Sequence, residues 1–68
     1  MSHVYKLIEL TGTSTMSVED AVQTAVKKAA ESVREMRWFQ VVETRGAITG
    51  DKVTEWQVTI KVGFSVED

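Results

Sequence analysis

The chain of 68 residues contains no cysteine and only one histidine, His3. The lack of cysteine excludes disulfide bonds and thiolate metal ligands, and a lone histidine gives no second soft ligand, so we expect no metal site. A domain of this size buries only about 60% of its unfolded surface, and small folds usually add a disulfide, a metal or oligomerisation. We therefore expect residues 1–68 to form a single domain that is stabilised by oligomerisation.

The sequence also lacks a strong excess of charge of one sign and a long apolar run. The net charge is −2 and both signs are interspersed, whereas nucleic-acid binding needs a basic face or stripe. No apolar segment approaches the length of a membrane span or of a signal-peptide core. We expect a soluble cytoplasmic protein with no nucleic-acid or membrane partner.

The patterns that are present predict three strands and one helix. The segment Val4 to Thr13 is rich in β-branched and aromatic residues, which is typical of a strand. Ser17 is a good helix N-cap, and apolar residues recur after it at steps of three and four, which predicts an amphipathic helix from Ser17 to Met36. Its apolar stripe consists of Val18, Ala21, Val22, Ala25, Val26, Ala29, Val33 and Met36.

Two further strands are predicted from Trp38 to Ile48 and from Lys52 to Val66, joined at Gly50-Asp51 by a two-residue hairpin turn. In the last strand, apolar and polar residues alternate with a period of two, as expected for a sheet with one face against a helix. The fold class is therefore α+β, with the order β-α-β-β and a three-stranded antiparallel sheet wrapped around one helix.

The expected length of the helix does not match that of the last strand. A helix of about 18–20 residues spans roughly 27–30 Å, whereas a strand of about 14 residues spans roughly 45 Å. The helix would leave part of the apolar face of the last strand uncovered, with Phe64 near the end of the uncovered part, and we expect another copy of the chain to cover it.

A tight turn at Gly50-Asp51 would set the register of the hairpin. It would place Phe39 on the core face and Trp38 on the outer face opposite Gly63, with Thr44 opposite Gln57. An outward indole suits an interface anchor, a platform for a planar ligand, or both. Trp38 and Gln57 would lie about six strand positions, or roughly 20 Å, apart. A small-molecule site that uses both would therefore combine residues from different copies.

Five short motifs in order along the chain give a resemblance to a known family. They are Gly12-Thr13-Ser14, Arg37-Trp38-Phe39, Glu43-Thr44-Arg45-Gly46, Trp56-Gln57-Val58 and Val62-Gly63-Phe64. With the helix between the first two, nearly the whole chain resembles the dodecins, small flavin-binding proteins of β-α-β-β fold that assemble as hollow dodecamers. The resemblance implies that symmetry-related Trp38 side chains stack on isoalloxazine rings, that Gln57 hydrogen-bonds the polar edge of the ring, and that Arg45 lies near the ligand.

The implied role is non-catalytic flavin storage, sequestration and photoprotection, and we identify no catalytic residue. Some relatives carry a basic residue where this chain has Ser65, so FMN, riboflavin and FAD are not ranked by the sequence, and coenzyme A is a possible further ligand. Arg45 could instead pair with Glu43 or lie on Trp56. The alternative function is a structural assembly module, with or without a nucleotide such as coenzyme A.

Overall fold

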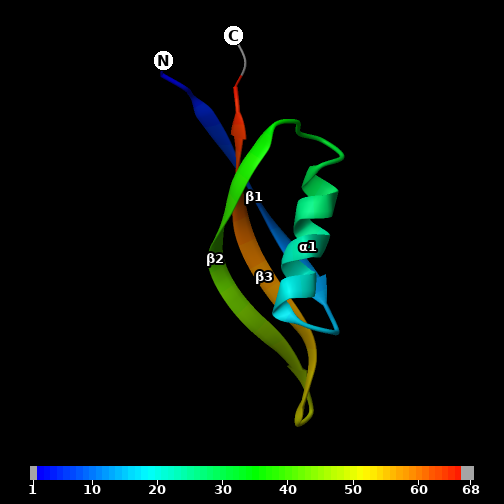
Figure 1. The fold of residues 1–68 in the computed structure, drawn as a ribbon. Helices are drawn as coiled ribbons and strands as arrows, with labels where there is room; N and C mark the ends of the chain where they lie inside the picture. Colours follow the sequence, from blue (N-terminus) through cyan, green and yellow to red (C-terminus); the bar gives the residue numbers. More distant parts are fainter. Residues whose placement is uncertain (1, 67–68) are drawn as a thin grey trace.

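The computed structural model describes residues 2–66; Met1, Glu67 and Asp68, which the expected single domain includes, lie outside the described residues. The elements are β1 (Tyr5–Ser14), α1 (Val18–Ala29), β2 (Met36–Thr49) and β3 (Lys52–Ser65). They confirm the predicted β-α-β-β order. The strands form one antiparallel sheet in the order β1-β3-β2, and α1 lies along one side of it (Figure 1).

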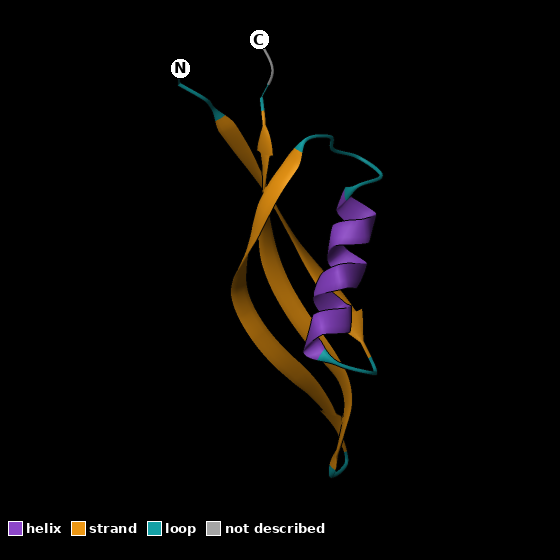
Figure 2. Cartoon of the chain, viewed as in Figure 1, coloured by secondary structure: helices purple, strands orange, loops and turns teal. Residues whose placement is uncertain are grey.

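The predicted hairpin is confirmed at its turn and at its far end. Thr49 pairs with Lys52, and Gly50 adopts a φ of 66°, which a residue without Cβ tolerates well. At the other end, Trp38 pairs with Gly63 as predicted. The loop at the tip of the hairpin projects well beyond the first turn of α1 (Figure 2).

The middle of the hairpin differs from the prediction because it contains two irregularities. The register shifts between Val41 and Glu43 on β2, and shifts back between Ala47 and Ile48. Each shift inserts an extra residue on one strand, which is how a β-bulge arises. The prediction that Thr44 pairs with Gln57 is therefore wrong: the residue opposite Gln57 is the next one along β2.

The helix begins where it was predicted but ends earlier. The Ser17 hydroxyl caps it by accepting a hydrogen bond of 3.0 Å from the backbone N–H of Asp20. After Ala29, tight turns replace the helix, and the chain reverses so that β2 can start at Met36. The predicted end at Met36 is wrong because Met36 reaches the core from the first position of a strand, which the helical spacing alone did not reveal.

The core is a close contact between small helix residues and the central strand. Its fully buried members are Ala21, Ala25, Val58, Ile60 and Val62. At Gly12 of β1 the helix backbone approaches so closely that a Cβ would overlap the carbonyl oxygen of Ala21 and lie 2.9 Å from the Cβ of Ala25. Alanines on the helix and a glycine on the strand therefore allow the two layers to touch.

The helix packs mainly on β1 and β3 and leaves β2 largely uncovered. Phe39 and Val41 share the helix side of the sheet with Val62 and Ile60, yet they are 50% and 45% exposed. Phe39 therefore lies on the core face as predicted, but α1 does not cover it within a single chain. The predicted uncovered apolar surface of β3 is present, but at the hairpin tip, where Val53 is 58% exposed, rather than around the half-buried Phe64. The edge strand β2 adds to this surface.

We expect Gly12→Ala to destabilise the fold by at least about 1–3 kcal/mol, because overpacking forces the helix away from the sheet. Urea unfolding followed by far-UV circular dichroism measures this change. Gly46→Ala is the matched control, since a Cβ at Gly46 would meet no atom closer than 3.5 Å. Equal unfolding midpoints for the two variants would contradict the proposed tight contact.

Candidate functional site

The indole of Trp38 lies on the outer face of the sheet, away from α1. A Cβ placed on Gly63 would overlap the indole ring, so the ring lies directly on the backbone of β3. The neighbouring Val62 points to the buried core on the other side. The side chain of Tyr5 meets the indole edge to face, with ring centroids 4.9 Å apart and planes at 71°. Trp38 nevertheless remains 42% exposed, so a large aromatic surface is held in place and still accessible.

A second group of side chains lies on the same face, nearer the hairpin tip. Arg45 pairs with Gln57 in the register, and its Nε donates a hydrogen bond of 2.6 Å to Gln57 Oε1. The Nε2 of Gln57 donates to Glu55 Oε1 at 3.2 Å. Arg45 also forms an ion pair of 3.4 Å with Glu43, which confirms the partner that the sequence left open. We call Glu43, Arg45, Glu55 and Gln57 the amide cluster.

The structure brings two of the three predicted ligand residues together and leaves the third apart. Arg45 and Gln57 are in contact, whereas Trp38 lies on Gly63, six residues along β3 from Gln57. Six strand positions correspond to roughly 20 Å. Thr59 lies between them, and its hydroxyl is hydrogen-bonded to that of Thr11 at 2.7 Å. One subunit therefore presents two separate patches on one face, as the sequence predicted.

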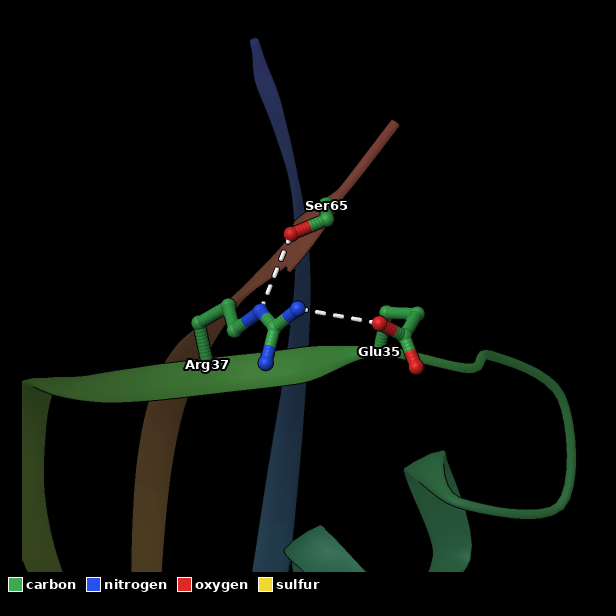
Figure 3. A network of polar contacts seen from close by, with 3 residues as sticks. All are labelled: Glu35, Arg37 and Ser65. Atoms are coloured by element: carbon green, nitrogen blue, oxygen red, sulfur yellow. Dashed lines mark hydrogen bonds and ion pairs between the residues drawn. The ribbon is translucent and has the colours of Figure 1, made fainter. Parts of the chain in front are cut away.

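A second polar network, not foreseen from the sequence, joins the start of β2 to the end of β3 (Figure 3). Arg37 donates from Nε to Ser65 Oγ at 3.0 Å, and from its terminal nitrogen to Glu35 Oε1 at 2.9 Å. The backbone N–H of Ser65 also donates to the carbonyl of Glu35 at 3.0 Å. Arg37 has no partner residue in the register because the pairing shifts around it. The hydroxyl of Ser65 thus already binds a cationic side chain.

Sequence reasoning missed Glu55 as well. Its signal was available, because Glu55 and Gln57 are two residues apart on a strand and must share a face. The network around Arg37 left no such signal, since it depends on an irregular register at the start of β2.

On the helix side, the start of β2 borders a hollow of about 270 Å³. Phe39 forms one wall, and Val26 of α1 and Val62 of β3 form others. This hollow lies on the opposite face of the sheet from the amide cluster. It adds a cavity to the uncovered apolar surface of β2.

Two further observations concern the described residues 2–66. They contain no helix that is both long and apolar enough to cross a membrane. They also contain no group of three or more His, Asp or Glu side chains arranged to hold a metal ion.

Comparison with known proteins adds independent information. The family model described as Dodecin matches residues 4–67. A curated protein named dodecin, from Thermus thermophilus, is 44% identical over 68 residues, covering all of this chain and 99% of the relative. The solved structure of dodecin from Streptomyces coelicolor superimposes with a TM-score of 0.91 at 41% identity, covering 97% of this chain and 94% of that one.

A more distant relative has a different name. The protein named calcium dodecin, from Mycobacterium tuberculosis, is 33% identical over 63 residues, covering 93% of this chain and 89% of the relative.

The agreement spans nearly the whole chain in both sequence and fold. The chain therefore belongs to the dodecin family, whose members are small binding proteins without catalytic activity.

Proposed function

We propose that this protein binds flavin by stacking the isoalloxazine ring on the indole of Trp38. The observation that carries the proposal is the position of this indole, which lies over Gly63 and is 42% exposed. Isoalloxazine is planar with an apolar body, and stacking of a base on an aromatic side chain, a close analogue, contributes about 1–3 kcal/mol. The contact with Tyr5 holds the indole in place before the ligand arrives.

The polar edge of the ring is bound by Gln57 and approached by Arg45. Because these residues lie roughly 20 Å from Trp38 within one subunit, the ring on one indole meets the amide cluster of another copy. The family resemblance supports a hollow dodecamer in which two rings lie between two symmetry-related indoles. The ligand site is then completed only by assembly.

The uncovered side of β2 supports this assembly. Phe39 and Val41 are about half exposed on the helix side, and Ile48 and Val53 are 70% and 58% exposed near the hairpin tip. Several large apolar side chains exposed along one strand are typical of protein–protein contacts. Packing another copy there would complete the core that α1 leaves open.

The proposed physiological role is flavin storage, sequestration and photoprotection. An indole stacked on the ring quenches the flavin excited state, and a ring enclosed between two indoles leaves no access for a substrate. The ligand is riboflavin, FMN or FAD. Ser65, which accepts a hydrogen bond from Arg37, carries no positive charge for a ligand phosphate and therefore does not rank these three flavins.

The alternative is a structural assembly module in which Trp38 packs against a neighbouring copy, with or without a nucleotide such as coenzyme A. The exposed apolar residues of β2 favour assembly under either function. The two proposals differ in the consequence of removing the indole: the assembly module loses its oligomer, whereas the flavin protein loses its ligand.

We expect Trp38→Ala to abolish the quenching of riboflavin or FMN fluorescence by the purified protein while the oligomer persists. Fluorescence titration measures the first property, and size-exclusion chromatography the second. Trp56→Phe is the control, because Trp56 lies opposite Gly46, next to the buried Val58, on the helix side of the sheet. Unchanged flavin emission at saturating wild-type protein would remove the proposed function. Loss of the oligomer in Trp38→Ala would favour the structural module.

A Cβ at Gly63 should disturb the same platform without removing the indole. Gly63→Ala would push the ring of Trp38 off the strand, and we expect riboflavin to bind at least about tenfold more weakly, equivalent to losing roughly 1.4 kcal/mol of stacking. Fluorescence titration measures the dissociation constant, with Gly46→Ala as the matched glycine control. Wild-type affinity in Gly63→Ala would contradict the role of this glycine.

Burying a charge on the uncovered side of β2 should prevent assembly. We expect Phe39→Asp to shift native mass spectra from a multiple of the 7.6 kDa chain towards the monomer, because an unpaired carboxylate is costly to bury. Gln40→Asp places the same charge at the next, also exposed position of β2, on the opposite face of the sheet where Gln40 pairs with Lys61, and serves as the control. An unchanged oligomer in Phe39→Asp would argue against this surface as an interface.

A further inference from the structure

The amide of Gln57 is held between a group that can only donate hydrogen bonds and a group that can only accept them. Arg45 donates to its oxygen at 2.6 Å, and Glu55 accepts from its nitrogen at 3.2 Å. A guanidinium has no acceptor and an ionised carboxylate has no donor. The chemistry of these two neighbours therefore fixes which end of the amide is oxygen and which is nitrogen.

The two neighbours leave each end of the amide with one unused position. A carbonyl oxygen accepts two hydrogen bonds, and an amide nitrogen donates two. Arg45 occupies one position on Oε1, and Glu55 occupies one on Nε2. Gln57 therefore still presents one acceptor and one donor, side by side and with a fixed polarity.

We propose that Glu55 is a positioning residue that sets the polarity of Gln57, so that the site selects a ring edge with adjacent N–H and C=O groups. This inference rests on the proposed flavin function. The pyrimidine ring of isoalloxazine carries such a cyclic imide edge, in which N3–H lies between two carbonyls. Its N–H meets Gln57 Oε1, and one carbonyl meets Gln57 Nε2.

Glu55 matters because, without it, Arg45 alone would oppose rotation of the Gln57 amide. Glu55 lies two residues before Gln57 on the same face of β3, and both residues are half-buried, whereas Arg45 is exposed. With Arg45 alone, rotation of the amide by 180° loses one solvent-exposed hydrogen bond and turns two donors towards each other, where water can separate them. With Glu55 in place, the same rotation also loses the part-buried hydrogen bond to Glu55 and sets two acceptors against each other.

The test compares riboflavin with 3-methylriboflavin, in which a methyl group replaces the imide hydrogen. For the wild-type assembly we expect riboflavin to bind at least about tenfold more tightly, the effect of one hydrogen bond of about 1.4 kcal/mol. In Glu55→Lys, position 55 can only donate, the amide loses its polarity, and this preference should fall to within about threefold. Fluorescence titration gives both dissociation constants for each variant.

Three variants make the result specific. Glu9→Lys makes the same change of charge on the same face of the sheet, because Glu9 pairs with Lys61, and it should keep the full preference. Glu55→Gln retains an acceptor and should keep most of it. Glu55→Ala removes the acceptor without adding a donor, and should lower the preference by about threefold or more even if Glu55→Lys does not assemble.

The possible outcomes distinguish failure of the proposed role of Glu55 from failure of the proposed flavin binding. No quenching of riboflavin by the wild-type protein would remove the proposed function. Quenching with a preference that is unchanged in both Glu55→Lys and Glu55→Ala would overturn the role of Glu55 and leave flavin binding intact. A fall of equal size in Glu9→Lys would show an effect of charge alone, and would also overturn it.

Discussion

The helix is too short and too narrow for the sheet that it covers, and most features of this protein depend on that mismatch. Twelve helical residues span about 18 Å, whereas the 14 residues of β3 span roughly 45 Å. In addition, α1 packs mainly on two of the three strands. The fully buried core is consequently limited to two alanines, two valines and one isoleucine. The proposed assembly would add to this small core by burying the remaining apolar surface against other copies.

The central strand connects the core to the candidate site. Side chains alternate along a strand, so Val58 and Val62 face α1 while Gln57 and Gly63 face outward. A slip of one residue would expose the valines and bury the amide of Gln57. The forces that fix the core register therefore also fix the position of the proposed ligand residues. This coupling explains how a single small sheet can combine a buried face with the proposed recognition face without a separate binding domain.

The features that could be predicted from the sequence depend on the spacing of apolar residues and on the residue types favoured at caps and turns. Alternation along β3, the capping residue Ser17 and the pair Gly50-Asp51 act locally, and the elements they predict are present. The features that were missed depend on distant backbone geometry. The helix ends early because the chain must reverse to pair β2 with β3. Between two register shifts on β2, Arg45 rather than Thr44 lies opposite Gln57. One of these shifts follows Gly46, a residue type that often marks a bulge within a strand, whereas the shift between Val41 and Glu43 has no recognisable residue signature.

The amide cluster requires a glutamine at position 57 for reasons that do not involve the ligand. A carboxylate there would pair well with Arg45, but it would lie beside Glu55 with no proton to share and would offer no donor. An apolar side chain would leave the half-buried Glu55 without its partner. Only a side chain with an acceptor at one end and a donor at the other satisfies both neighbours. The order of these two groups, set within the protein, is the order that a cyclic imide edge needs. The geometry that the proposed flavin site requires is therefore already set by Arg45 and Glu55, so that the glutamine would be ordered during folding rather than during binding.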